Sequence, residues 1–386
     1  MKRGAAKNTL GRRELGQSAL AVLAYACAFG SSACGGFRTG TGASAGAAPG
    51  AGSLRSRASS ASGAGASGAP FPSDARVELW SWFDLPDDRR SRELSGIAWD
   101  AAQRTLWAVQ DDEPNLVALV PDAALRAWRF GETIRVQVDG PLDLEGLVAL
   151  PNGEGFVVSS EIGPRILEID RKGRLRREIR FPAKLCEALE NKSLESLTMS
   201  PDGRWLVTAS EVALPRDGSL ASPEGGTRVR IVRIDRAAGE VTEHAYATDP
   251  TVKNAVGSDF GVADLAAITS DDLLVLERGW AKGVGNRVRV YRVSLASREA
   301  AEAACEAKEH LDGAAILAKK LFVDVAHLEA KGLPPAKQPQ ESPLLDNYEG
   351  IALGPVLADG RRTVFLVSDD NARSDQYARL LVLAVG

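Results

Sequence analysis

The feature that most constrains this chain of 386 residues is a motif that recurs five times after residue 90. Each copy combines an acidic residue with small and aliphatic residues, and a strand-like run with carboxylates at or near its end follows about 13 to 19 residues later. The opening segments are 93–98, 143–148, 193–198, 262–266 and 347–352, and the closing runs are 106–112, 156–161, 206–211, 273–278 and 364–371. A repeat of roughly 50 residues or more, built from short β runs, is typical of a propeller in which each repeat forms one blade.

The second repeat shows most clearly how one blade would be built. Apolar runs at 146–150, 156–161, 165–170 and 175–181 are separated by turn residues, among them Pro151-Asn-Gly153 and Lys172-Gly173. Short runs bounded by such turns predict consecutive antiparallel strands. The repeat therefore predicts a four-stranded blade.

The last repeat ends one strand short of a full blade, with 377–385 as its final strand. Near the start of the folded region, Ala75 to Trp82 is a strand-like run with no preceding partner, so it can supply the missing strand and close the ring. Closure removes the exposed edges of an open array. We expect an all-β propeller of five four-stranded blades, with six as the alternative if a further blade lies between Asp264 and Glu349, where a short helical insertion is expected at 300–318.

The N-terminal region differs in composition from the repeats. Lys2, Arg3, Lys7, Arg12 and Arg13 precede an apolar run at 19–29 that is too short to span a bilayer stably but fits the core of a signal peptide. We predict a signal peptide at 1–33, a disordered linker rich in Gly, Ala and Ser at 34–72, and the propeller domain at 73–386. Export to the periplasm, to the outer membrane as a lipoprotein, or to the medium follows from this organisation.

Ser31-Ser-Ala-Cys34 can be read as a small-residue cleavage site or as a lipoprotein site acylated at Cys34. A lipid anchor at Cys34 is the only membrane contact that we expect. Cys186 and Cys305 lie in two helix-like insertions and either pair in an oxidising compartment or remain two thiols. The formal net charge of −4 gives no basic field for nucleic acid, and we expect a monomer.

The charged residues of the repeats define a candidate site. The first strand of a blade lies nearest the axis, which places Glu145, Glu195 and Glu349 at one mouth of the central channel. The second strand returns to the same end and brings further acids there: Asp111, Asp112, Glu161, Glu211, Glu277, Asp369 and Asp370.

So many acids at one mouth repel one another unless they are neutralised. A hard divalent cation, with calcium expected, takes six to eight oxygen ligands and is the usual solution. Arginine is the other, and Arg165 and Arg278 are placed to contribute. In the competing interpretation, each acid only caps its own blade through hydrogen bonds to backbone amides and hydroxyls.

Several of these segments together resemble the Phytase-like family, described as having esterase-like activity of phytase. The resemblance runs through Glu93-Leu-Ser-Gly96, Asp143-Leu-Glu-Gly-Leu147, Phe156 to Pro164, Leu276-Glu-Arg278, Asn347-Tyr-Glu-Gly-Ile-Ala352 and Val367 to Asn371 with Gln376. It implies a secreted or envelope propeller that hydrolyses phosphate or other esters.

The function that follows is metal-assisted hydrolysis of a small anionic ester. A cation would polarise the ester oxygen and acidify the attacking water. We assign Glu161, Glu211, Arg165 and Arg278 to catalysis and substrate binding, and the remaining mouth acids to the metal. The one Gly-x-Ser-x-Gly match, Gly42-Ala-Ser-Ala-Gly46, lies in the low-complexity linker and does not follow a predicted strand, so no serine nucleophile is expected. The alternative is a non-catalytic ligand-binding or scaffold propeller of the cell envelope.

Overall fold

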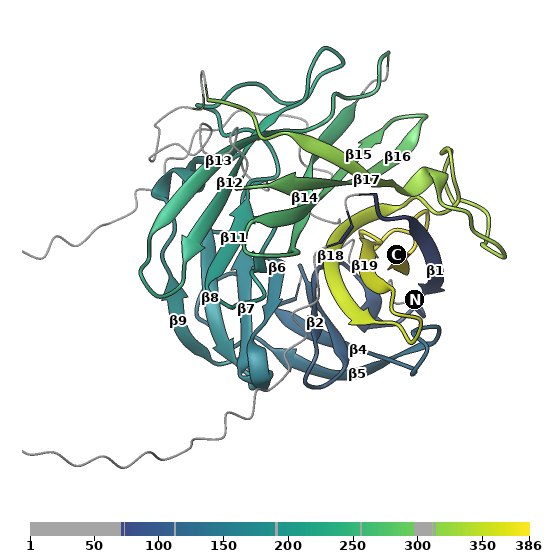
Figure 1. The fold of residues 1–386 in the computed structure, drawn as a ribbon, viewed down its shortest axis with the longest axis horizontal. Coiled ribbons are helices and arrows are strands. Elements are labelled where there is room, and N and C mark those ends of the chain that lie inside the picture. The colour runs from purple at the N-terminus through teal and green to yellow at the C-terminus, as the bar shows by residue number, and fades with distance from the viewer. Residues whose placement is uncertain are drawn as a thin grey trace, which may run out of the picture. The chain divides into compact units, whose positions relative to one another are not determined.

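The computed structural model describes residues 71–72, 74–111, 113–189, 192–254, 257–296, 311 and 314–386. Within these residues the chain forms five antiparallel sheets of four strands each, and its helices are short 3-10 turns. The prediction of an all-β propeller with five blades is confirmed, and the alternative of six blades is wrong. Figure 1 shows the five sheets arranged around a common centre.

The sheets are numbered blades I to V, and the strands of blades I to IV follow one another from the axis outward. Blade I contains β2 (Leu94–Asp100), β3 (Thr105–Gln110), β4 (Asn115–Pro121) and β5 (Trp128–Arg135). Blade II contains β6 (Leu144–Ala149), β7 (Gly155–Ser160), β8 (Arg165–Asp170) and β9 (Leu175–Ile179). Blade III contains β10 (Thr198–Met199), β11 (Trp205–Ala209), β12 (Arg228–Asp235) and β13 (Val241–Ala247). Blade IV contains β14 (Ser258–Ala267), β15 (Asp272–Ala281), β16 (Gly285–Ser294) and β17 (Lys319–Asp324).

Blade V joins the two ends of the described chain. It consists of β18 (Asn347–Val356), β19 (Arg362–Asp369), β20 (Arg379–Val385) and, outermost, β1 (Val77–Asp84). Strand β1 pairs with β20 along its length, and the backbone N–H of Arg76 donates to the oxygen of Gly386 at 2.8 Å. Figure 1 shows β1 beside the C-terminal strands. The predicted closure by the Ala75–Trp82 run is therefore present, because the last blade borrows its outer strand from the beginning of the domain.

The hydrophobic core consists of five clusters, and each cluster lies between two neighbouring blades. Trp107 of blade I meets Phe156 of blade II edge to face at 5.1 Å between ring centroids. Phe365 of blade V lies 5.6 Å from both Trp99 and Trp128 of blade I. Every blade buries apolar side chains on both faces, so each blade is stabilised by its two neighbours. The contact of blade V with blade I closes the ring.

The inner strands approach one another so closely that some positions exclude a side chain. A Cβ atom at Gly96 would lie 2.2 Å from the backbone oxygen of Glu145, and one at Gly146 would lie 2.5 Å from the Cβ of Leu197. Both contacts join one blade to the next around the axis. The glycine in the repeated motif is therefore required by the narrow centre of a five-bladed ring.

Several sequence predictions fall outside the described residues. These are the signal peptide at 1–33, nearly all of the linker at 34–72, most of the helical insertion expected at 300–318, and Cys305, so its pairing with Cys186 stays a prediction. The described part of that insertion, residues 314–318, is not helical. The helix-like segment expected at Ala183 is the 3-10 helix η4 (Ala183–Glu187). The other 3-10 turns are η2 (Arg89–Ser91), η3 (Pro151–Gly153) and η5 (Val325–His327). Among the described residues, none belongs to a helix with the length and apolar character needed to cross a membrane.

Candidate functional site

One residue on or just after the second strand of each blade defines a ring position, and in blade IV the strand continues beyond it. Asp111 and Glu161 hold it in blades I and II, because their N–H groups donate to the oxygens of Glu93 and Asp143 at 3.1 and 2.9 Å. The strand register gives the equivalents in blades IV and V, where Arg278 pairs with Gly261 and Asp369 pairs with Asn347. Glu211 ends the matching run of blade III. Four blades thus supply an acid here, and blade IV supplies an arginine.

A second layer of acids comes from the inner strands. Glu145, Glu195 and Glu349 are all buried, with 4, 6 and 3% of their surface exposed. Burial raises the pKa of Glu145 and of Glu195 well above the usual range, and the negative charges of Glu349 and Glu161 raise both further. The structure therefore brings these inner carboxylates into one electrostatic group with the ring acids. We call this group the acidic mouth; its members are Asp111, Asp143, Glu145, Glu161, Glu195, Glu211, Glu349 and Asp369.

On the side of blades III to V, two basic residues neutralise the acidic mouth. Arg278 Nη2 lies 3.0 Å from Glu349 Oε1 and 3.7 Å from Glu211 Oε1. Lys192 Nζ lies 3.0 Å from Glu211 Oε2 and 2.9 Å from Asp259 Oδ2. Burial lowers the pKa of Arg278, but the carboxylates of Glu349 and Glu211 outweigh that effect, so its pKa is raised overall. Arg278 therefore stays charged and neutralises the carboxylates of Glu349 and Glu211 on this side of the mouth.

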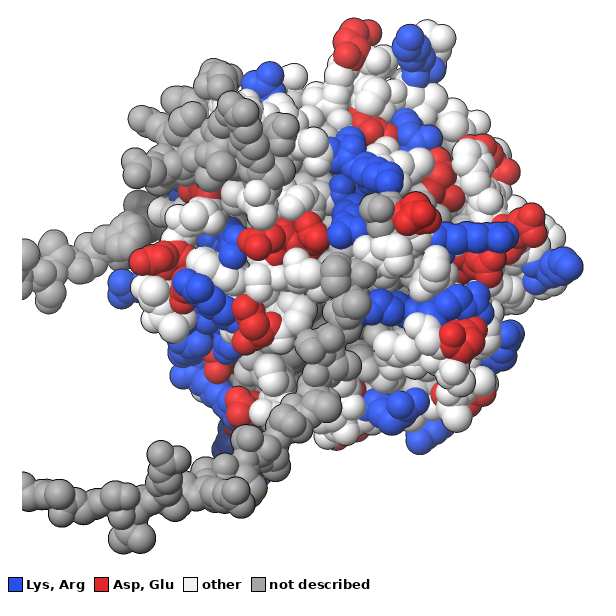
Figure 2. Space-filling view, viewed as in Figure 1, with Lys and Arg blue, Asp and Glu red and all other residues white. Residues whose placement is uncertain are grey.

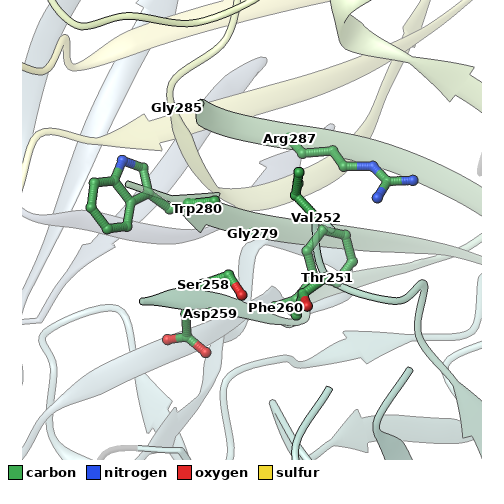
Figure 3. A pocket seen from close by; sticks show the side chains of 10 residues that line it. Thr251, Val252, Ser258, Asp259, Phe260, Gly279, Trp280, Gly285 and Arg287 are labelled. Atoms are coloured by element: carbon green, nitrogen blue, oxygen red, sulfur yellow. The ribbon is translucent and has the colours of Figure 1, made fainter. Parts of the chain in front are cut away.

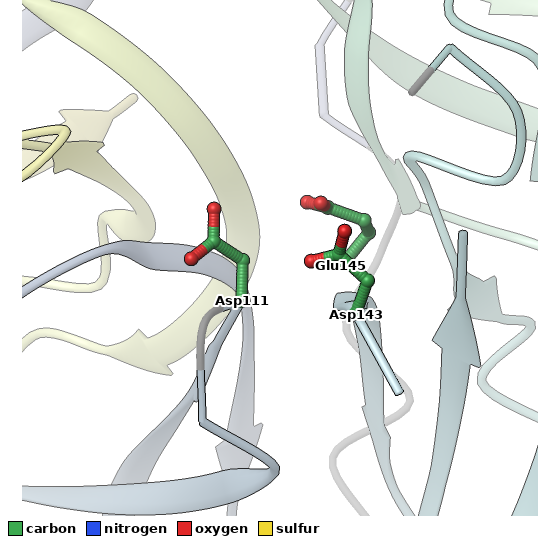
Figure 4. A group of neighbouring side chains, drawn as sticks. All are labelled: Asp111, Asp143 and Glu145. Atoms are coloured by element: carbon green, nitrogen blue, oxygen red, sulfur yellow. The ribbon is translucent and has the colours of Figure 1, made fainter. Parts of the chain in front are cut away.

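On the side of blades I and II, acids face acids. One carboxylate oxygen each from Asp111, Asp143 and Glu145 lies within 4.8 Å of the other two. Figure 4 shows Asp111 on one side of the gap with Asp143 and Glu145 on the other. Ser95 Oγ donates to Glu145 Oε2 at 2.6 Å, and the charges that act most strongly on Glu145 are all carboxylates. Three oxygens at this spacing match the ligand type that calcium and magnesium prefer.

Glu161 adds a second observation that points to a cation. Its Oε1 accepts from the backbone N–H of Ser193 at 2.6 Å, but its Oε2 is buried with no hydrogen-bond donor among the described residues. Burial raises the pKa of Glu161 to about 7, an effect that the Ser193 bond and a side-chain hydrogen bond with Glu195 partly offset and that Glu211 and Asp143 reinforce. A buried carboxylate oxygen without a donor is costly unless a ligand or a cation satisfies it. The residues present therefore fit a divalent cation.

The structure corrects the placement of Glu277. Its carboxylate accepts from Tyr246 Oη at 2.5 Å and from the N–H of Asp249 at 2.8 Å, and it lies 2.5 Å from Lys319 Nζ. Successive residues of a strand point to opposite faces, so Glu277 faces blade III while Arg278 faces the mouth. The sequence alignment of blade IV was off by one residue.

Arg165 also lies away from the acids. It forms an ion pair with Glu178 at 3.0 Å and donates to the oxygen of Asp139 at 3.1 Å. Its partner Glu178 is on β9, the outer strand of blade II. Four residues of sequence separation from Glu161 led us to expect proximity, but the strand that begins at Arg165 carries its side chain outward.

The remaining predicted acids have varied surroundings. Asp369 is fully buried and accepts from the N–H of Asn371 at 2.7 Å and from Asn347 Nδ2 at 3.3 Å. Asp370 accepts from the backbone N–H groups of Glu93 and Ala372 at 3.2 and 3.1 Å, as the capping interpretation expects. Asp112 lies outside the described residues.

Asp264 occupies a position that the sequence did not reveal. The strand register places Asp264 at the position that Gly96 and Gly146 hold in blades I and II, and the bulge beside it, between Val262 and Asp264, recurs in the inner strands of blades I, II and V. Its carboxylate accepts from the N–H of Leu197 on blade III at 3.3 Å and from that of Ile351 on blade V at 2.9 Å. Burial raises the pKa of Asp264 well above the usual range. Beside it, a cavity of about 140 Å³ is lined by inner-strand residues of all five blades.

Three members or neighbours of the mouth were missed as site residues. Asp143 was part of the recognised motif, and its position opposite Glu161 could have been read from the antiparallel pairing. Lys192 precedes the motif of blade III, and Asp259 lies near the start of β14 before the motif of blade IV, so no repeat marks them. Only the fold brings these two together.

Comparison with known proteins agrees with this architecture. A family model described as "Phytase-like: Esterase-like activity of phytase" matches residues 89–372. The chain belongs to the Phytase-like family. The search of curated proteins found no match to this chain.

Three solved structures with similar folds show how far the likeness extends. A luciferin-regenerating enzyme is 15% identical over 81% of this chain and 95% of its own, with a TM-score of 0.37. Kuenenia stuttgartiensis hydrazine synthase is 13% identical over 77% of this chain and 69% of its own, with a TM-score of 0.33. A tail fibre of Staphylococcus aureus phage P68 is 12% identical over 80% of this chain and 52% of its own, with a TM-score of 0.44. At these values the comparisons carry no functional argument.

Proposed function

We propose that this Phytase-like protein is a divalent-cation-dependent hydrolase of small anionic esters, with calcium as the cation. The observation that carries the proposal is the acidic side of the mouth, where oxygens of Asp111, Asp143 and Glu145 lie within 4.8 Å of one another beside the unsatisfied Glu161 Oε2. Asp111, Asp143 and Glu145 would hold the cation, and Glu161 lies beside them. When bound, it would polarise an ester oxygen and lower the pKa of a water molecule.

The protein groups have separable roles in this proposal. Arg278 and Lys192 carry positive charge on the opposite side of the mouth, where they would attract the anionic part of the ester. Glu161 lies beside the cation ligands and would take the proton of the attacking water as a general base. Glu211 orients both basic residues through its two oxygens. Arg165 takes no part.

One observation favours a second function, a non-catalytic propeller whose cation only stabilises the ring. The Arg278 side chain is just 15% exposed and already paired with Glu349. An arginine that is satisfied inside a blade junction has less capacity to bind substrate. Turnover separates the two functions, because both require the cation but only the hydrolase releases product.

The test uses the full-length protein. Calcium binding is measured by calorimetry, and hydrolysis is measured with a phosphomonoester and a carboxylic ester in calcium and in chelator. We expect Glu145→Gln to abolish both binding and turnover, while Glu178→Gln, a change of the same kind on the outer strand of blade II, leaves both unchanged. Calcium binding without turnover of either ester would support the scaffold function, and turnover that persists in chelator would overturn the metal-dependent mechanism.

We also propose that the protein is exported and acts as a monomer. The basic N-terminus and the apolar run at 19–29 support export, and Cys34 supports a lipid anchor. Figure 2 shows acidic and basic side chains interspersed on the face in view, which is consistent with a small-molecule ligand instead of nucleic acid. Cell fractionation with mass measurement of the mature N-terminus tests export, and Cys34→Ala should release an anchored protein from the membrane fraction.

A further inference from the structure

Blade IV extends beyond the acidic mouth. Its first three strands, β14, β15 and β16, each contain ten residues, whereas β6, β7 and β8 of blade II each contain six. The register shows where the extra residues lie, since Gly261 pairs with the ring residue Arg278 and the pairing continues outward through Asp259 and Trp280 to Ser258 and Ala281. The blade therefore forms a wall that rises past the ring position.

Trp280 lies on this wall on the same face as Arg278. The two residues are separated by one residue along β15, so their side chains point to the same side about 7 Å apart along the strand. Phe260 lies on the opposite side and fills the space left by Gly279. Figure 3 shows the Trp280 indole extending away from Phe260, Thr251 and Val252. The indole thus belongs to the side that carries the substrate-binding arginine.

The indole is held in place but not covered. Trp280 is 39% exposed, and its Nε1 donates to Gln338 Oε1 at 3.1 Å. The segment that contains Gln338 is itself tied to the mouth, because Lys337 Nζ donates to the oxygen of Gln376 at 2.6 Å, and Asn371 Nδ2 donates to Gln376 Oε1 at 3.0 Å. The N–H of Asn371 in turn donates to the ring acid Asp369 at 2.7 Å. A fixed aromatic face with solvent on one side is preorganised to stack against a ligand.

We propose that Trp280 forms a subsite for a ring carried by the ester substrate, so that the preferred substrates are esters of ring-bearing alcohols. This inference rests on the proposed function, because it places the ester group between the cation and Arg278. A ring attached one or two bonds from that group would then reach the indole. Stacking on the indole should raise the affinity for a ring-bearing ligand about tenfold, which corresponds to about 1.4 kcal/mol.

The test is a binding experiment that needs no turnover. Phenylphosphonate and methylphosphonate share the anionic group and differ only in the ring, and calorimetry of the full-length protein in calcium gives the affinity of each. We expect the wild type to bind phenylphosphonate about tenfold more tightly than methylphosphonate. Trp280→Ala should remove this preference, whereas Trp280→Phe should retain most of it.

The control is Val284→Ala, an exposed residue at the turn of the same hairpin, which should leave the preference unchanged. An unchanged preference in Trp280→Ala, no preference in the wild type, or no binding of either phosphonate would overturn the subsite. Failure of the proposed function has a different signature. If the phosphonates discriminate as predicted but no ester is hydrolysed, the subsite stands and the hydrolase does not.

Discussion

The carboxylate of Asp264 on blade IV accepts a hydrogen bond from the backbone N–H of Ile351 on blade V at 2.9 Å. Its other oxygen accepts from the N–H of Leu197 on blade III at 3.3 Å. Ile351 and Leu197 each lie two residues after an acid of the mouth, Glu349 and Glu195. One side chain therefore ties together the two inner strands that present these carboxylates.

We predict that Asp264→Asn lowers the free energy of unfolding by about 2 kcal/mol, because the amide turns a donor toward N–H groups that need an acceptor. Urea denaturation measures the loss. Asp359→Asn, an exposed change in a surface turn, is the matched control and should cost less than about 0.5 kcal/mol. Equal stability of the two variants would show that the axial hydrogen bonds contribute nothing.

A second prediction concerns ring closure. Deleting residues through Asp84 removes β1 and exposes the edge of β20, so we expect aggregation or loss of a single cooperative melting transition. A truncated protein that begins at Phe71 keeps β1 and serves as the control. If the shorter protein melts cooperatively at the same temperature as the control, closure by β1 is not needed for stability.

The pH dependence of stability follows from Glu161. Its pKa is raised from 4.5 to about 7 in the folded protein, so the folded state binds this proton more tightly than the unfolded state. Without calcium, the free energy of unfolding should therefore fall as the pH rises from about 4.5 to 7, by an amount on the order of 3 kcal/mol. Thermal unfolding in chelator across this range measures the effect.

Two comparisons check this assignment. Glu161→Gln should make the decrease smaller, while Glu145, Glu195 and Asp264, whose pKa values are also raised, continue to contribute; Glu178→Gln should leave it unchanged. With calcium present, the trend should weaken or reverse, because the cation binds the deprotonated carboxylates. Stability that rises with pH in chelator would contradict the raised pKa.

Arg278 offers a prediction about the division of the mouth. We expect Arg278→Ala to keep calcium binding within about threefold of the wild type, because the cation ligands lie on the other side. The variant should raise KM for anionic esters about tenfold or more, since one charge-assisted contact is lost. It should also lower the melting temperature, because Glu349 and Glu211 lose a partner. Loss of calcium binding would show that the two sides are not independent.

The repeats predicted the fold well because the blade pattern is local. Turn residues, short apolar runs and the unpartnered Ala75 run are all visible in the sequence, and each constrains which strand pairs with which. Glu145, Glu195 and Glu349 were predictable for the same reason, as they recur at one place in the motif.

Blade IV was harder to predict because its closing run carries two adjacent charged residues, Glu277 and Arg278. Nothing in the sequence marks which of them faces the mouth, so Glu277 was aligned with the ring acids although that position belongs to Arg278. Lys192 and Asp259 form an ion pair only because the ring places blade III beside blade IV. Their contact depends on the angle between blades III and IV, which no local pattern encodes.

The central claim is that the acidic mouth binds a divalent cation, and thermal unfolding of the full-length protein at increasing calcium concentration tests it most directly. Binding to the folded state alone raises the melting temperature as calcium rises. We predict such a rise for the wild type and for Glu178→Gln, and its loss when Glu145 and Glu161 are both replaced by Gln. Equal melting temperatures for the wild type in calcium and in chelator would contradict the claim.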